Sequence, residues 1–210
     1  MISLGLYASI GEAWISVLKK IFEEGTPVYA KDEEYTEYKG LCIDIKIGNE
    51  ADPIIEKYSD PSIISWMSSN FENFQPIKEL NYARSYASRL YSYNGVKNQI
   101  TWVVEKIKKN PITRSATITT FEPLTDTDYV PCVSLLDFDK NDDVLDMYVY
   151  ARALDLGGKA YANLLCLQKI LVDVAQGIEC EVGCIHLICK SVHVYRSSYE
   201  KMKQIIMQEE

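Results

Sequence analysis

The chain has 210 residues, of which 47% are hydrophobic and 25% are charged, and its formal net charge is −8. This composition predicts one domain spanning 1–210 with a substantial core, and it excludes a disordered or fibrous chain. The acidic excess excludes general nucleic-acid binding, because phosphate backbones require clustered Lys and Arg. Because no apolar run reaches the ~20 residues of a membrane helix and no signal peptide is recognisable, we expect a cytoplasmic protein without a membrane partner.

The first half of the chain predicts two amphipathic helices and one strand. Residues 11–24 place apolar side chains on one helical face and are followed by Gly25, a helix stop. Residues 41–47 alternate apolar and polar side chains, as in a strand with one covered face. Residues 60–76 are weakly patterned, and we assign them no regular element. Residues 99–109 repeat apolar side chains at helical spacing and end before Pro111.

The second half alternates β-rich runs with one strongly apolar helix. Strands are predicted at 116–121, 132–138, 144–153 and 184–189, separated by acidic or Pro-containing turns. Residues 160–175 carry apolar side chains on most faces, which predicts a helix running through the core. Helices mixed with successive strands predict an α+β fold with helices packed on the sheet.

Cys132 is the most informative of the six cysteines, because it follows Pro131 where a polar turn enters an apolar strand. Two interpretations remain open: a buried structural side chain, or a nucleophile whose pKa is lowered by nearby cations. The cysteines at 180, 184 and 189 lack the close pairs of a zinc site, so we expect no metal.

Five polar residues lie unusually close to apolar elements. Arg152 ends a long strand, where it either pairs with Asp155 or binds an anionic ligand. Asn163 interrupts the apolar helix, so its amide either bonds to the core or faces a ligand that needs a donor and an acceptor. His193 and Tyr195 share one face of an extended segment and either pack there or bind a sugar hydroxyl.

These residues together resemble the thymidylate synthase and pyrimidine nucleotide hydroxymethylase family, especially its short archaeal-type members. VPC at 130–132, RALD at 152–155, YAN at 161–163 and HVY at 193–195 follow the family's PC, RSxD, Asn and HxY motifs in order and spacing. The resemblance is clearest over 86–200. It implies a mixed sheet packed with helices around a buried central helix, and a homodimer formed through the sheet.

The resemblance assigns the covalent chemistry to Cys132, which would add to C6 of a pyrimidine 5′-monophosphate so that C5 becomes a nucleophile. Asn163 would recognise the base, with its amide donating to O4 and accepting from N3–H of uracil. Tyr86, in YASRL, resembles the family's YGxR segment and joins the catalytic group.

The remaining family positions imply substrate and donor contacts. Arg152 would bind the phosphate, and Arg114, in a loop that resembles PxxRR, would bind it across the dimer interface. His193 and Tyr195 would hold the ribose hydroxyl. Asp155 would bind the pterin ring of a methylenetetrahydrofolate or related tetrahydropterin donor.

Several family residues are absent. Ser115 replaces the second Arg of PxxRR, Ala153 the Ser after the strand-end Arg, and Val133 the His after the nucleophile. No segment like ELLWFL, which carries the family's proton-relay Glu, can be placed. Lys31 lies near the expected position of an N-terminal phosphate Arg.

The departures leave three functions open. The favoured one is conversion of dUMP to dTMP, since a reader of cytosine is expected to carry a carboxylate in place of Asn163. The second is 5-hydroxymethylation of CMP, dCMP, dUMP or UMP, because water attacks the same intermediate when aromatic walls do not exclude it. The third is a nucleotide-binding homologue that has lost catalysis. Ala153 also leaves the choice of ribose or deoxyribose open.

Overall fold

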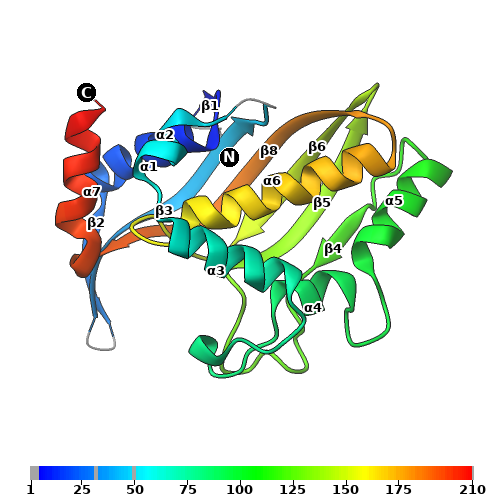
Figure 1. Cartoon of the computed structure of the whole chain (residues 1–210), viewed down its shortest axis with the longest axis horizontal. Helices are drawn as coiled ribbons and strands as arrows, with labels where there is room; N and C mark the ends of the chain where they lie inside the picture. The colour runs from blue at the N-terminus through cyan, green and yellow to red at the C-terminus, as the bar shows by residue number, and fades with distance from the viewer. Residues whose placement is uncertain (1–4, 31–32, 49–50, 210) are drawn as a thin grey trace.

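A mixed β-sheet forms the centre of the molecule, and the longest helix crosses one of its faces (Figure 1). The computed structural model describes residues 5–30, 33–48 and 51–209. The eight strands of these residues are β1 (Leu6–Tyr7), β2 (Thr26–Ala30), β3 (Glu33–Lys46), β4 (Thr117–Thr119), β5 (Val133–Asn141), β6 (Val144–Ala151), β7 (Leu154–Asp155) and β8 (Glu181–Tyr195). The α-helices are α1 (Ile10–Glu24), α2 (Pro53–Tyr58), α3 (Pro61–Glu72), α4 (Tyr86–Tyr91), α5 (Gln99–Lys109), α6 (Ala160–Gly177) and α7 (Arg196–Gln208). The predicted α+β class is confirmed.

The sheet order brings distant parts of the chain together at one place. The order is β1-β3-β8-β6-β5-β4, with β2 paired to β3 and β7 to β8. β6 and β8 are parallel, so α6 serves as the crossover that a parallel pair requires. Val133 at the start of β5 pairs with Ala151 at the end of β6, and Asp155 pairs with His193. The motifs around Cys132, Arg152 and His193 therefore meet at neighbouring strand ends.

The central helix α6 is buried as its apolar sequence predicts. Its first turn is buried on every side, from Ala160 to Leu164, and further along the helix Leu167, Ile170 and Leu171 form one buried face. In Figure 1 this helix passes in front of β8, β6 and β5, beside α3. The Trp14 Nε1–H of α1 donates to the carbonyl oxygen of Leu156 over 2.8 Å, which ties the turn before α6 to the first helix.

The predicted helices at 11–24 and 99–109 are confirmed, but the assignment of no regular element to 60–76 is wrong. That stretch contains α3, and α2 lies just before it. In both helices an Asp N-cap accepts backbone N–H groups and Pro occupies the first helical position: Asp52 caps α2 and Asp60 caps α3. β3 and β8 are also longer than predicted, and α7 follows β8 directly.

The sheet face opposite to α6 carries exposed apolar side chains. Along β6, Met147 and Val149 are buried, whereas Tyr148 and Tyr150 between them are about two-fifths exposed, at 41% and 39%. Leu135 of β5 lies opposite Tyr150 and is 36% exposed. An apolar sheet face of this kind is suited to covering by another protein surface. The dimer through the sheet stays a prediction.

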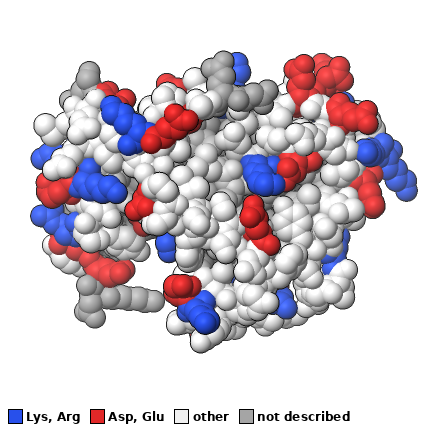
Figure 2. Space-filling model, viewed as in Figure 1, with Lys and Arg blue, Asp and Glu red and all other residues white. Residues whose placement is uncertain are grey.

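The surface charges are mixed on the face that α3 and α6 cover. Acidic and basic side chains are interspersed there among uncharged ones (Figure 2). None of the helices in the described part of the chain is long and apolar enough to cross a membrane.

Candidate active site

Arg152 is hydrogen-bonded to the segment that carries Cys132. Its Nε donates to the carbonyl oxygens of Val130 and Pro131 over 3.0 and 3.2 Å, and its Nη2 donates to Val130 over 2.7 Å. The backbone N–H of Arg152 also donates to the carbonyl oxygen of Cys132 over 2.8 Å. No hydrogen bond among the described residues uses Nη1, so this charged donor can bind an anionic ligand beside Cys132.

The Cys132 thiol is mostly buried and lies near two cations. Burial raises the pKa of this thiol above its usual value, whereas the charges of Arg152 and Lys159 lower it and that of Asp155 raises it. The net shift is upward, so the thiol is mostly protonated at pH 7. The two cations favour the thiolate, which is the reactive form, against the cost of burial.

Tyr86 contacts the strand that begins after Cys132. Its hydroxyl oxygen accepts the backbone N–H of Val133 over 3.0 Å, and its own N–H donates to the Asn70 side chain over 2.9 Å. The ring stacks on Phe71 with centroids 4.4 Å apart. Burial raises the pKa of Tyr86 well above its usual value, so the hydroxyl stays protonated and can donate a hydrogen bond next to Cys132.

Asp155 lies in a turn that two glycines make possible. The Gly157 N–H donates to Asp155 Oδ1 over 3.1 Å, and a Cβ at Gly158 would collide with Oδ2. Burial raises the pKa of Asp155 to about 6, although the N–H groups of Gly157 and Gly158 and the charge of Lys159 oppose the shift. The carboxylate is therefore ionised at pH 7 and protonated below pH 6.

Asn163 has an unsatisfied acceptor in the core. The residue is 5% exposed, and its Nδ2 donates to the carbonyl oxygen of Lys159 over 3.0 Å. Its Oδ1 is buried without a hydrogen-bond partner among the described residues. A buried acceptor without a donor costs about 1–3 kcal/mol. A ligand with an N–H group would satisfy it.

His193 and Tyr195 lie near the end of β8 and share an aromatic neighbour on β3. The Tyr35 ring centroid lies 5.4 Å from that of His193 and 5.8 Å from that of Tyr195. Burial lowers the pKa of His193, although Glu37 on β3 opposes the shift, so the imidazole is neutral at pH 7. Burial raises the pKa of Tyr195. Both side chains are uncharged hydrogen-bonding groups.

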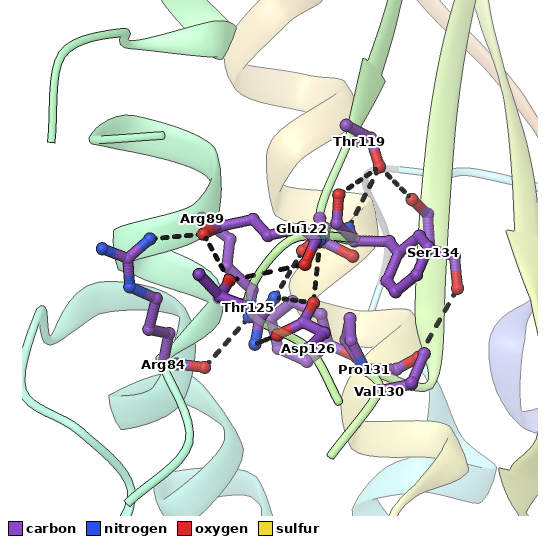
Figure 3. Close-up of polar contacts among 12 residues, drawn as sticks. Arg84, Arg89, Thr119, Glu122, Thr125, Asp126, Val130, Pro131 and Ser134 are labelled. Atoms are coloured by element: carbon purple, nitrogen blue, oxygen red, sulfur yellow. Dashed lines mark hydrogen bonds and ion pairs between the residues drawn. The ribbon is translucent and has the colours of Figure 1, made fainter. Parts of the chain in front are cut away.

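A buried ion pair positions the segment that leads to Cys132 (Figure 3). Arg89 of α4 donates to both carboxylate oxygens of Asp126 over 2.6 and 2.7 Å, and the two side chains are 2% and 5% exposed. The Glu122 N–H donates to Asp126 over 2.8 Å, and Arg84 pairs with Glu122. Removing one partner of a buried pair costs about 3–5 kcal/mol. This network therefore holds the chain between β4 and β5 in place.

One predicted phosphate ligand, Arg114, does not join this group within a single chain. Arg114 is exposed in the bend between α5 and β4, and it makes no ion pair or hydrogen bond with the described residues. Ile112 in the same loop is 84% exposed. Lys31 lies outside the described residues. Among the described residues, the cations that act on the Cys132 thiol are Arg152 and Lys159.

Lys159 is the site residue that sequence reasoning missed. Its Nζ lies 4.2 Å from the centroid of the Trp66 ring of α3, and its charge acts on both Cys132 and Asp155. The available signal was its position four residues before Asn163, which places the two on one helical face. Within residues 5–30, 33–48 and 51–209, no cluster of three His, Cys, Asp or Glu side chains could hold a metal ion.

Comparison with known proteins assigns the chain to a family. The sequence profile of the family described as thymidylate synthase matches residues 50–210. The chain therefore belongs to the thymidylate synthase family, and the predicted resemblance is confirmed. Membership implies, in general terms, a nucleotide substrate and a folate co-substrate.

Relatives of two kinds are similar to the chain. A Methanosarcina mazei protein named "Putative thymidylate synthase" is 31% identical over 210 residues, covering 94% of this chain and 92% of that protein. A protein of the same name from Methanococcoides burtonii is 29% identical over 208 residues, with the same coverage. The deoxyuridylate hydroxymethyltransferase of Bacillus phage SP01 is 38% identical over 115 residues, covering 52% of this chain and 30% of that protein.

Proposed function

We propose that the chain transfers a one-carbon unit from a methylenetetrahydrofolate-type donor to C5 of a pyrimidine 5′-monophosphate, converting dUMP to dTMP. The observation that supports this most strongly is the convergence of Arg152, Asp155 and Tyr86 on Cys132 from separate parts of the chain. These are the residues that the family motifs single out.

The covalent step belongs to Cys132. Its thiolate adds to C6, the C5–C6 π electrons shift toward C4, and the electron pair of the C4 carbonyl moves onto O4, which makes C5 nucleophilic. When the one-carbon unit has joined C5, the C5 proton must leave. The buried, neutral Tyr86 hydroxyl lies next to the start of β5. We assign it to the path along which the proton leaves C5.

The substrate contacts follow from the available donors and acceptors. Asn163 Oδ1 accepts N3–H of uracil, which satisfies its buried lone pair, and Nδ2 turns from the Lys159 carbonyl to O4. Arg152 Nη1 binds the phosphate beside Cys132. His193 and Tyr195 bind the ribose hydroxyl as uncharged groups.

The donor contact makes a pH-dependent prediction. The donor supplies the one-carbon unit, and the ionised Asp155 carboxylate accepts N–H groups of its pterin ring. Because burial raises the pKa of Asp155 to about 6, the donor KM is expected to rise as pH falls from 7 to 5. Asp155→Asn should give a KM that is high and independent of pH, whereas Asp173→Asn on the α6 surface should keep the wild-type profile. A flat wild-type profile would contradict this role.

We propose a homodimer whose interface is the exposed sheet face with Leu135, Tyr148 and Tyr150. The exposed loop with Arg114 also supports this proposal. Arg114 would bind the phosphate in the site of the partner chain. In a two-fold dimer each site then takes Cys132 from one chain and Arg114 from the other.

Mixing two inactive variants tests this arrangement. Cys132→Ser and Arg114→Ala should each lose activity alone, and after unfolding and joint refolding the mixture should regain roughly a quarter of wild-type activity, because half of the dimers carry one intact site. Joint refolding of Cys132→Ser with Arg152→Ala is the control: both residues come from the same chain of a site, so each site of the mixed dimer carries one of the two substitutions and the mixture should stay inactive. If the Arg114→Ala mixture stays inactive, Arg114 does not cross the interface.

Hydroxymethylation is the second candidate, because the phage deoxyuridylate hydroxymethyltransferase is similar over half of the chain. Its product differs in what adds to the methylene group on C5 as Cys132 leaves C6: water gives hydroxymethyl, and hydride from the donor, which is thereby oxidised, gives methyl. Incubation with dUMP, UMP, dCMP or CMP and the donor, followed by mass spectrometry of the nucleotide, separates the candidates. A gained methyl group supports the synthase, a gained hydroxymethyl group supports the second candidate, and an unchanged mass with every nucleotide contradicts both.

A further inference from the structure

Lys159 lies at the N-terminus of α6, one turn before the proposed base-recognising residue Asn163. It is the N-cap residue of the helix, and its carbonyl oxygen accepts both the backbone N–H and the Nδ2 of Asn163 at 3.0 Å. The two side chains therefore lie on one face at the entrance of an 18-residue helix. The positive end of the helix dipole adds to the ammonium charge at this point.

The ammonium group is held in position without a carboxylate partner. Nζ lies 4.2 Å from the ring centroid of Trp66, which is half-buried on α3. No ion pair within 4.0 Å involves Lys159 among the described residues, although its positive charge lowers the pKa of the nearby Asp155. An ammonium that is oriented but not neutralised by a structural ion pair can interact with a ligand anion.

The neighbours of Lys159 indicate which anion this is. The positive charge of Lys159 acts on the Cys132 thiol, and Asn163, with its unsatisfied Oδ1, follows one turn later along the helix. Arg152 occupies the side toward Val130 and Pro131, where we place the phosphate. Lys159 is thus on the side of the base.

We propose that Lys159 is a further catalytic residue, whose ammonium group contacts O4 of a uracil base and stabilises the charge that develops there. This inference rests on the proposed function. When the sulfur–C6 bond forms, the displaced electron pair ends on O4, and the ammonium keeps its protons and donates a hydrogen bond to that oxygen. The same donor opposes a cytosine base, whose 4-amino group is also a donor, so Lys159 selects 4-oxo pyrimidines.

The first test measures the effect of Lys159 on the thiol without any nucleotide. The rate at which iodoacetamide alkylates Cys132, followed by peptide mass spectrometry, is expected to fall several-fold at pH 8 in Lys159→Met, because the thiolate loses one of its two cations. Lys159→Arg should retain most of the rate. Lys169→Met, on the same helix but exposed and paired with Asp173, is the matched control. An unchanged rate in Lys159→Met would overturn the proposal.

The second test measures nucleotide binding by calorimetry. Lys159→Met is expected to bind dUMP about tenfold or more weakly, the loss of one hydrogen bond to a charged group, and to bind dCMP no more weakly than wild type does. If Lys159→Met lost equal affinity for both nucleotides, or lost none, the contact with O4 would be overturned. Binding of dUMP by the wild type would in that case leave the proposed function standing. If the wild type bound neither nucleotide, the proposed function would fail, and this inference with it.

Discussion

Replacing Cys132 by Ser is expected to lower kcat with dUMP by at least about 10³-fold, the scale of loss when a covalent nucleophile is removed. Ser fills nearly the same volume, and the backbone hydrogen bond from Arg152 to residue 132 does not depend on the side chain. A Ser hydroxyl gains little from the two nearby cations, because its pKa lies far above that of a thiol. Nucleotide binding should persist while turnover is lost.

The measurement is single-turnover kinetics together with calorimetry of dUMP binding. Cys180→Ser is the control, since Cys180 immediately precedes β8 and the hydrogen bond of its thiol is a long one, 3.7 Å to the Ile178 carbonyl oxygen. This control should keep the wild-type kcat. Full turnover in Cys132→Ser would rule out the covalent mechanism.

Replacing Asn163 by Asp is expected to shift the preference from uracil toward cytosine by on the order of 10²-fold in kcat/KM. The position is 5% exposed, so burial raises the pKa of the introduced carboxyl and favours its protonated form. A protonated carboxyl donates to N3 of cytosine and accepts from its 4-amino group. In its ionised form the carboxyl still accepts from the 4-amino group of cytosine but has no donor for O4 of uracil.

The comparison requires dUMP and dCMP side by side in the same assay. Asn163→Ala removes the donor and the acceptor that match uracil, so it should weaken dUMP more than dCMP and reduce the preference for uracil without reversing it. The role of Asn163 in base recognition would be contradicted if the Asp and Ala variants had the same ratio of kcat/KM values as the wild type.

Hydrophobic periodicity located the helices that bury one continuous stripe. α1 and α5 begin and end within one residue of the predicted ranges, and α6 extends the predicted helix by two residues. These helices repeat apolar side chains over three or more turns, so the pattern is unambiguous. Residues 33–40 of β3 were missed because they are half-buried or exposed, and residues 33–37 pair with the largely exposed strand β2, where neither face has to be apolar.

Helices α2 and α3 were missed for a different reason. Each starts with Asp followed by Pro, a pair that is as common in turns as at a helix start. Only the residues that follow distinguish a helix start from a turn. In α3 few of them are buried, such as Met67 and Phe71. Helix α7 likewise rests on Met202, Ile205 and Ile206 within an otherwise polar segment.

The candidate site was predictable from motif spacing to the extent that its residues lie in one chain. Cys132, Arg152 and His193 meet because adjacent strand ends carry them. The helical spacing of Lys159 and Asn163 was a signal in the sequence, but the contact that positions the ammonium group is with Trp66, which lies in a helix that patterning missed. The partner chain of Arg114 stays a prediction.

The central claim is that Cys132 activates C5 of a uridylate, and the release of tritium from dUMP labelled at C5 tests it most directly. With the methylenetetrahydrofolate donor present, the wild-type protein is expected to release tritium into water, and Cys132→Ser is expected to release none. Binding of dUMP in calorimetry with no tritium release by the wild type would contradict the claim and indicate a nucleotide-binding homologue without catalysis.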